Sequence, residues 1–228
     1  MGDTWGQPVG VLSALSEVVI VNLEPGMADE LERIELTCFP MANPDDLLSK
    51  EDILAYADVF PEGYFVAIAD GRPVGMGAGI YLDFDFHHPE HTIAEITGAH
   101  QCGNHDPEGD WYYGTDITVL PQYRGRGIGG MLYDRRKALV IRDGKRGIIA
   151  GGSLPGYYHH KATMPIDEYV DKVVAGELHD PTLSFQMSHG FEVRGLLENY
   201  LEDEADDGWA ALIVWENRSG HARPTIGS

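Results

Sequence analysis

The sequence is poor in cysteine and has no long apolar run. Its two cysteines, Cys38 and Cys102, are too few for a disulfide framework, which is typical of a reducing compartment. No apolar stretch approaches the length that spans a bilayer, and Met1 to Val21 lacks the basic start of a signal peptide. We therefore expect a cytoplasmic protein that does not act at a membrane.

Positive charge is also scarce. The chain has 16 lysines and arginines against 37 acidic residues, which gives a formal net charge of -21. This balance argues against a nucleic acid partner, because a phosphate backbone attracts the opposite sign. It favours cationic ligands such as amines, although solubility alone or a salt-rich habitat explains the charge at least as well.

The composition is otherwise that of a folded globular protein. Hydrophobic residues make up 43% of the 228 residues and aromatic residues 10%, enough for one packed core. We expect a single domain over residues 1–228. Within it, 1–16 is predicted to be a loose lead, 83–109 an insertion rich in histidine and glycine, and 217–228 a flexible tail.

Apolar periodicity and turn residues predict an alternation of strands and helices. The predicted strands are 18–23, 64–69, 73–81, a central strand that ends near Val119, 146–152, 191–201 and 209–215. The predicted helices are 27–39, 49–60, one that begins after a glycine-rich turn near residue 127, 165–176 and 181–188. An Asp-Gly turn at 70–71 joins two of the strands into a hairpin. This order indicates an α/β sandwich with a mixed sheet.

The glycine-rich turn after the central strand has the features of an anion-binding site. Its glycines are Gly125, Gly127, Gly129 and Gly130. Glycines allow unusual backbone conformations and a close approach of the main chain to a ligand. The helix start adds unpaired N–H groups and a positive dipole end, and Arg124 and Arg126 add charge. The turn therefore predicts a ligand that carries phosphate.

Two common nucleotide-binding motifs fit this turn poorly. The string Gly125-x-Gly127-x-x-Gly130 matches the dinucleotide fingerprint, which needs its first glycine directly after the strand and an acidic residue about 20 positions later. Here residues 121–124 intervene, and the later region around Lys145 and Arg146 is basic. A P-loop is excluded because a methionine follows Gly130 where the motif needs lysine.

The turn resembles that of the GNAT superfamily of N-acetyltransferases. Gln122-x-x-Gly125-x-Gly127, preceded by Val119-x-Pro121, is similar to the family's pyrophosphate-binding motif. The resemblance implies that the turn amides hold the pyrophosphate of acetyl-CoA, while the main chain at Ile117 and Val119 bonds the pantetheine arm. The residues that it assigns to acetyl-CoA are Ile117, Thr118, Val119, Gln122, Tyr123, Arg124, Gly125, Arg126, Gly127, Ile128, Gly129 and Gly130.

The same resemblance extends along the chain and implies a fold. Residues 146–156 and 179–191 look like a subset of GNAT proteins, some of which are joined to a carbon-nitrogen hydrolase domain. The implied fold is a GNAT-like α/β sandwich with a mixed, mostly antiparallel sheet and splayed central parallel strands, between which the CoA arm lies. Dimers are common in this family, so a homodimer stays open.

The resemblance also implies a mechanism of direct attack. A neutral amine attacks the thioester without an acyl-enzyme, and a backbone N–H, here that of Val119, stabilises the oxyanion. Asp116 on the central strand is the first candidate for the base that removes the ammonium proton, and Glu95 is the second. An ion pair with a neighbouring arginine, or exposure to solvent, is the alternative for Asp116.

The acid that protonates the leaving thiolate is less clear from the sequence. Many family members use a tyrosine four residues before a Gly-Phe pair, and counting back from Gly190 reaches Gln186, which cannot donate a proton as an acid. Tyr157 and Tyr158, with His159, follow the fifth predicted strand and are candidate substitutes. Aromatic packing or acceptor binding is the alternative role for these residues.

Two other chemistries have weaker support. The string His87-His88-Pro89-Glu90-His91 matches a zinc-peptidase pattern, but that chemistry needs a helix, which Pro89 forbids. A looser metal cluster stays open among His88, His91, His100, Cys102 and His105. Ser153 approaches a nucleophile elbow but has proline where the last glycine belongs.

We therefore expect an enzyme that transfers an acetyl group from acetyl-CoA to a small-molecule primary amine. The main alternative is an acyl-CoA-binding regulatory or interaction module without turnover, which the glutamine at position 186 makes credible. A zinc-dependent hydrolase is a distant third. The identity of the acceptor cannot be predicted, because acceptor sites are built from variable loops.

Overall fold

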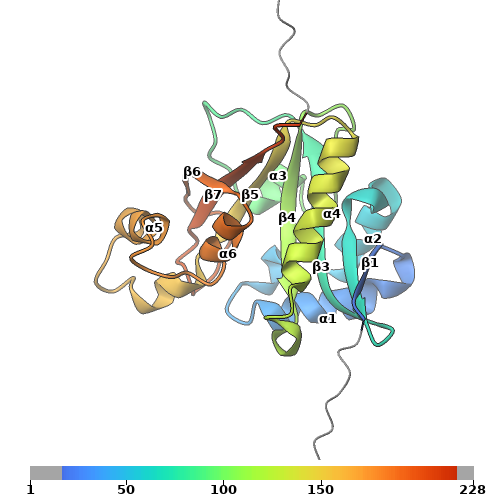
Figure 1. The fold of residues 1–228 in the computed structure, drawn as a ribbon, viewed down its shortest axis with the longest axis horizontal. Coiled ribbons are helices and arrows are strands. Elements are labelled where there is room, and N and C mark those ends of the chain that lie inside the picture. The colour runs from blue at the N-terminus through green and yellow to red at the C-terminus, as the bar shows by residue number, and fades with distance from the viewer. Residues whose placement is uncertain (1–16, 220–228) are drawn as a thin grey trace, which may run out of the picture.

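The computed structural model describes residues 17–219, which form a seven-stranded sheet with helices on both faces (Figure 1). The strands are β1 (Val19–Asn22), β2 (Phe65–Ala69), β3 (Arg72–Leu82), β4 (Trp111–Val119), β5 (Gly147–Ser153), β6 (Glu192–Leu197) and β7 (Ala210–Glu216). Their spatial order is β1-β2-β3-β4-β5-β7-β6, and every neighbouring pair is antiparallel except β4 and β5. The predicted α/β sandwich with a mixed, mostly antiparallel sheet is confirmed.

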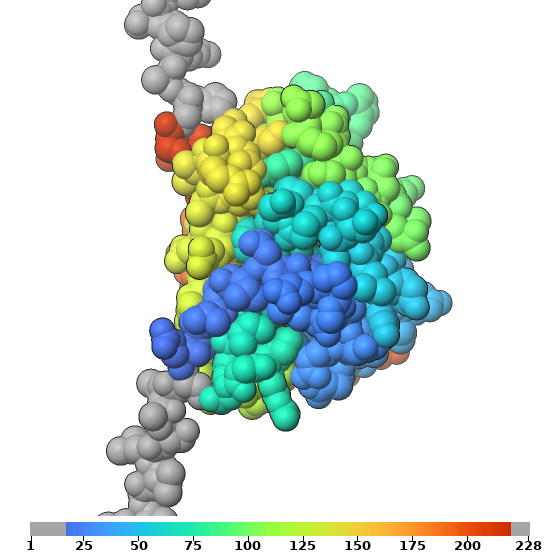
Figure 2. Space-filling model, turned by 90° about the vertical axis from the view of Figure 1, so that its right-hand side faces the viewer, coloured from blue at the N-terminus to red at the C-terminus, as the bar shows by residue number. Residues whose placement is uncertain are grey.

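The helices are α1 (Ala28–Cys38), α2 (Lys50–Val59), α3 (Ile93–Thr97), α4 (Ile128–Arg142), α5 (Ile166–Val174) and α6 (Leu183–Ser188). Side chains alternate across a strand, so Tyr112 and Tyr113 of β4 point into different cores. The core that contains Tyr112 is covered by α4, and the core that contains Tyr113 by α1 and α2. In Figure 2 α4 (yellow) lies toward the left of the view and the green residues of the 83–109 segment toward the top and right, and the two meet at the top.

Local sequence signals explain several element boundaries. Ser49 caps α2 through a capping box with Asp52: the Ser49 hydroxyl oxygen accepts the Asp52 N–H at 3.2 Å, and the Asp52 carboxylate accepts the Ser49 N–H at 3.0 Å. The hairpin turn between β2 and β3 has positive φ at both central residues, 52° at Asp70 and 73° at Gly71. These elements lie where the sequence predicted them.

The two central parallel strands splay apart. Hydrogen-bonded pairing between β4 and β5 covers Trp111 to Tyr113 against Gly147 to Ile149, although the strands continue to Val119 and Ser153. A bulge shifts the register of β4 against β3, because Ala78 pairs with Asp116 whereas Gly79 pairs with Gly114. The diverging ends form a V-shaped opening, which confirms the predicted splayed strands.

The segment 83–109 is more ordered than its composition suggested. It contains α3, which has its own capping box between Thr92 and Glu95 and ends at Gly98 in a left-handed conformation. The Tyr81 N–H also donates to Nδ1 of His105 at 3.1 Å, which ties the end of the segment to β3.

The structure describes only part of the two ends that were predicted to be flexible. The lead at 1–16 and residues 220–228 of the tail lie outside the described residues. At the start of the tail the prediction was wrong, because Asn217 is buried and bonded. Its N–H donates to the Arg146 carbonyl at 2.8 Å, and its side-chain amide donates to the Lys145 carbonyl at 3.0 Å. Within residues 17–219, no helix has the length and apolar character needed to cross a membrane.

Candidate active site

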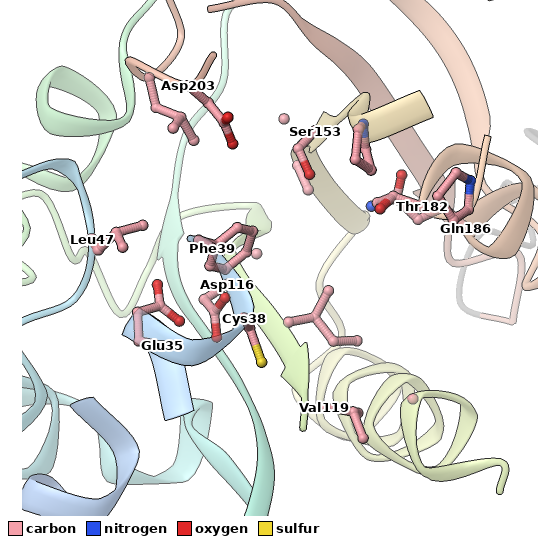
Figure 3. Close-up of a pocket in the computed structure, with 18 of the residues that line it drawn as sticks. Glu35, Cys38, Phe39, Leu47, Asp116, Val119, Ser153, Thr182, Gln186 and Asp203 are labelled. Carbon is pink, nitrogen blue, oxygen red and sulfur yellow. The ribbon is translucent and has the colours of Figure 1, made fainter. Parts of the chain in front are cut away.

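The opening between β4 and β5 leads into a cavity of about 840 Å³. Its walls come from α1, β4, the turn before α4, β5, α6 and the loops around residues 39–48 and 200–205. Figure 3 shows Glu35 and Asp116 side by side on one wall, with Gln186, Thr182 and Ser153 across the cavity and Asp203 on a third side. The sheet thus brings together residues from both halves of the sequence.

The glycine-rich turn forms one end of this cavity. Gly125 and Gly127 have φ of 72° and 81°, and within the described part of the chain no heavy atom lies within 4 Å of a Cβ built on either. Glycine is therefore needed there for backbone conformation rather than for space. The first turn of α4 follows directly and presents N–H groups that have no partner within the helix.

Gly129 and Gly130 have a different role from the one that the sequence suggested. A Cβ on Gly129 would lie 2.7 Å from the Phe185 ring, and one on Gly130 would lie 3.0 Å from Nε2 of His189. These glycines allow α4 to pack closely against α6 and the residue that follows it. Of the four glycines in the turn, only Gly125 and Gly127 have the positive φ that favours glycine.

Side chains from the turn fix its shape. Nε of Arg124 donates to the Val119 carbonyl at 2.9 Å, and a guanidinium nitrogen of Arg126 donates to the Gln122 carbonyl at 3.1 Å. The Arg126 guanidinium also lies 5.1 Å from the centre of the Tyr123 ring. Both arginines are exposed, and Arg124 also lines the cavity. The positive charge near the start of α4 thus belongs to residues that also brace the turn.

The free edge of β4 faces the cavity. The Leu120 N–H donates to the Val74 carbonyl of β3 at 2.9 Å. Because N–H groups alternate sides along a strand, the N–H groups of Val119 and Ile117 point away from β3 and into the opening. The predicted cofactor residues that line the cavity are Ile117, Val119, Tyr123, Arg124, Gly125, Gly127, Ile128 and Gly129; those that do not are Thr118, Gln122, Arg126 and Gly130.

Two carboxyl groups meet on the wall formed by α1 and β4. Glu35 and Asp116 are both buried, line the cavity and lie close enough for the charge of Asp116 to act on Glu35. Among residues 17–219, Oε2 of Glu35 has no hydrogen-bond partner. Burial raises the pKa of Asp116 to about 7. Burial and the nearby charge of Asp116 raise the pKa of Glu35 well above its ordinary value. Both carboxyl groups therefore keep their protons to a higher pH than free carboxyl groups do.

Arg136 of α4 fixes the position of Asp116 from the other face of the sheet. Its guanidinium donates to the Ala78 carbonyl at 2.7 Å and to the Asp116 carbonyl, which lie at the bulge of β4. The side chain is only 2% exposed, and it fits there because Gly77 and Gly114 have no side chains to exclude it. Its charge lowers the pKa of Asp116 and so opposes part of the effect of burial.

The opposite wall carries Gln186 and one of the two candidate tyrosines. Gln186 is 3% exposed, and its Oε1 atom has no hydrogen-bond partner among residues 17–219. Tyr158 lines the cavity and is 48% exposed. The Tyr157 hydroxyl instead donates to the Met164 carbonyl at 3.0 Å, and Tyr157 is not among the lining residues. The structure therefore brings Tyr158, but not Tyr157, to the cavity.

Two loops close the far side of the cavity. Residue Asn43, between α1 and α2, donates its N–H to the Glu202 carbonyl at 2.7 Å and its amide to the Glu202 carboxylate at 2.9 Å. The Glu202 N–H in turn donates to Asp46 at 2.8 Å. Ala42 forms an isolated bridge with Asp203, which lines the cavity next to this junction. This side of the cavity is therefore bounded by acidic loop residues.

Several residues singled out from the sequence lie elsewhere. Glu95 is exposed, accepts the Thr92 N–H at 2.8 Å in the cap of α3 and is not among the lining residues. Among residues 17–219, no three His, Cys, Asp or Glu side chains are placed to hold a metal ion. Cys38 lines the cavity, but burial raises the pKa of its thiol to about 11, which makes it a poor nucleophile.

Sequence reasoning missed Glu35 and Arg136, although each leaves a signal. Glu35 lies beside Leu31, Ile34 and Cys38 at helical spacing, so it is a charged residue on an apolar face. Arg136 lies four residues after Leu132 and three before Leu139 on the buried face of α4. A charged residue on the buried face of a helix indicates a partner in the interior.

Known proteins resemble this chain over most of its length. Residues 28–151 match the model of the acetyltransferase (GNAT) family. The chain is 34% identical over 190 residues to YkwB of Bacillus subtilis, described as an uncharacterized N-acetyltransferase, covering 83% of this chain and 84% of YkwB. It is 35% identical over 202 residues to the probable hydrolase YhcX of Bacillus subtilis, covering 88% of this chain. The chain spans only 39% of the length of YhcX.

A solved structure has the same fold. The loading GNATL domain of CurA from Lyngbya majuscula superposes with a TM-score of 0.76 at 20% identity, covering 88% of this chain and 98% of that domain. At this level of identity the likeness concerns the fold alone.

Proposed function

Because the chain belongs to the acetyltransferase (GNAT) family, we propose that it transfers an acetyl group from acetyl-CoA to a primary amine. The amine attacks the thioester directly while both substrates are bound. The observation that carries this proposal is the cavity itself, which joins an anion-binding helix start at one end to the Glu35–Asp116 pair at the other.

The residues at the turn end fit a CoA molecule. Pyrophosphate oxygens accept hydrogen bonds from the free N–H groups at the start of α4, with Arg124 and Arg126 adding charge. The pantetheine amides bond the free edge of β4 at Ile117 and Val119. Oε1 of Gln186, on the opposite wall, is a buried acceptor that lacks a partner within the described chain and suits a pantetheine N–H. Glutamine at this position then serves cofactor binding instead of acid catalysis.

The carboxyl pair suits an ammonium acceptor. A negative charge on Glu35 or Asp116 attracts an ammonium group, and a pKa near 7 makes Asp116 a stronger base than an ordinary aspartate. Asp116 takes a proton from the ammonium and leaves the neutral amine free to attack. Because the Val119 N–H points into the opening, it is placed to donate to the oxyanion that forms.

Tyr158 is the remaining candidate for the acid. Its position in the lining and its exposure allow it to give a proton to the leaving thiolate and to regain one from water. Tyr157 is excluded from this proposal because its hydroxyl is bonded to a carbonyl outside the cavity.

The test is release of free thiol from acetyl-CoA across a panel of primary amines. We expect amine-dependent release, loss of about 100-fold or more in kcat for Asp116→Asn, and an unchanged KM for acetyl-CoA. Asp143→Asn is the matched control, because Asp143 follows α4 and is paired with Arg142 outside the cavity. Equal rates in the wild type and Asp116→Asn would refute the assigned base.

One rival is favoured by a specific observation, the glutamine at position 186 in place of an acid. In that case the protein is an acyl-CoA-binding module without turnover. Calorimetry with CoA, run beside the thiol assay, separates the two functions. CoA binding without thiol release on any amine of the panel would favour the module.

A further inference from the structure

Three side chains connect the cavity to the surface of the molecule in one hydrogen-bonded chain. Tyr200 lines the cavity, and its hydroxyl lies 3.1 Å from that of Tyr113. The Tyr113 hydroxyl lies 2.6 Å from Nε2 of His91. Both tyrosines are buried, whereas His91 is only partly buried, in the segment between β3 and β4. A histidine from the unexplained His-rich stretch thus lies behind the cavity wall.

The carbonyl of Pro89 sets the direction of this chain. It lies 2.6 Å from Nδ1 of His91, and because a carbonyl can only accept, Nδ1 carries a hydrogen. In the neutral ring Nε2 is therefore an acceptor. In this structure the Tyr113 hydroxyl donates to Tyr200. Donation from Tyr113 to Nε2 of neutral His91 requires both hydroxyls to rotate, so that Tyr200 then donates to Tyr113 and the Tyr200 oxygen accepts a proton from the cavity. When His91 is protonated the order reverses, and Tyr113 donates to Tyr200.

Burial keeps the chain in its accepting state at neutral pH. Burial lowers the pKa of His91, against the opposing effects of the Pro89 carbonyl and of the Glu90 and Glu95 charges. Burial also raises the pKa of both tyrosines, so their hydroxyls stay neutral and pass a proton on without holding a charge.

The proposed reaction needs such a path. An ammonium nitrogen loses two protons on becoming an amide, the sulfur of CoA gains one, and one proton leaves to water. We propose that Tyr200, Tyr113 and His91 form a proton relay that carries this proton from the cavity to the surface. The relay rests on the proposed function, because it serves an amine acceptor.

The proton balance of the step is complete. Asp116 takes the first proton before attack. The second leaves the nitrogen after the carbon–nitrogen bond has formed, when the nitrogen is positively charged and acidic. It passes to the Tyr200 oxygen while the Tyr200 proton moves to Tyr113 and the Tyr113 proton moves to Nε2 of His91, which releases a proton to water. Tyr158 protonates the thiolate and then takes a proton back from water. Asp116 later releases its proton to water, so these two exchanges with water cancel.

The Tyr113→Phe variant breaks the relay in the middle with little change of shape. We expect kcat to fall on the order of 10- to 100-fold, with an unchanged KM for acetyl-CoA. Tyr64→Phe is the matched control: Tyr64 is fully buried in the same core, and its hydroxyl loses a bond of 2.9 Å to the Met76 sulfur. We expect its kcat to stay within about twofold. Equal kcat in the wild type and Tyr113→Phe would overturn the relay.

The pH profile separates proton transfer from packing. Activity requires both Asp116 without its proton and His91 neutral, so log kcat in the wild type should rise with a slope of about 2 below the pKa of His91. Tyr113→Phe should keep only the Asp116 limb, with a slope of about 1. In His91→Ala, added imidazole should restore part of the lost rate, which a packing defect would not allow. A slope of about 1 in the wild type, or no rescue, would contradict the relay.

An NMR titration of His91 tests the chain without any turnover. Tyr113 donates to the neutral ring only, so Tyr113→Phe should raise the pKa of His91. An unchanged pKa would overturn the relay even if the enzyme is active. If the wild-type protein acetylates no amine, the proposed function is overturned instead. The relay would then have no reaction to serve.

Discussion

Replacing Asp116 by asparagine should make the protein more stable as well as less active. The pKa of Asp116 is about 7 in the folded chain, against an ordinary value of 3.8. Between these pH values the folded state binds a proton that the unfolded state does not, so stability falls as pH rises through this window. The difference corresponds to about 4 kcal/mol, at about 1.4 kcal/mol per pKa unit. Asparagine cannot ionise and removes this penalty.

The measurement is thermal unfolding of both proteins at pH 5 and pH 8. For a chain of this size 1 kcal/mol shifts Tm by about 2–4 °C, so Asp116→Asn should melt roughly 8–16 °C above the wild type at pH 8. The gap should narrow as pH falls, because below about pH 3.8 Asp116 is protonated in both states. Activity should fall in the same variant, because the base is gone.

Two further variants sharpen this prediction. Glu35→Gln should also gain stability at alkaline pH, because the pKa of Glu35 is raised by burial as well. Asp143→Asn should behave in the opposite way, because Arg142 holds the pKa of Asp143 below its ordinary value, and that stability is present above the unfolded pKa and lost as pH falls. An Asp116→Asn protein with the same pH dependence of Tm as the wild type would refute the reasoning.

Other predictions concern the turn, the acid and a helix cap. Gly127→Ala should weaken acetyl-CoA binding, because φ of 81° costs an alanine about 1–2 kcal/mol and moves the turn amides; calorimetry measures it. Gly129→Ala should cost about 1–3 kcal/mol of folding stability, measured by urea unfolding, because its Cβ meets the Phe185 ring. Tyr158→Phe should lower kcat about 10-fold or more without changing KM, and unchanged turnover would remove it from the mechanism. Ser49→Ala should lower the free energy of unfolding by about 1 kcal/mol, and a fully retained urea midpoint would contradict the role of this cap.

Much of the fold was predictable because the relevant signals are local. The capping box at Ser49, the Asp70-Gly71 hairpin and the glycine-rich turn each lie within a few residues of sequence. The short α3 within the 83–109 segment was not among the predicted helices, because the segment's polar composition gives little apolar periodicity; its cap comes from Thr92 and Glu95. The start of the tail was misjudged because Asn217 is held by carbonyls about 70 residues earlier in the chain.

The candidate site was less predictable, because it depends on which buried groups meet. Asp116 was named from its place on the central strand, but its pKa depends on Glu35 from α1 and Arg136 from α4. Tyr157 and Tyr158 could not be told apart in sequence, and only the lining of the cavity separates them. The sequence did not show where the Glu95 side chain lies. The structure places it in the cap of α3 rather than in the cavity.

By itself, the sequence determined the order of the elements, the family resemblance and the glycine-rich turn, because periodicity, caps and glycine positions act over a few residues. The tertiary structure alone decided where β4 and β5 part, which carboxyl groups lie together in the cavity wall, and how Tyr200 connects through Tyr113 to His91. These features depend on contacts between distant segments, and no local pattern specifies the distance between two side chains that meet only after the sheet has formed.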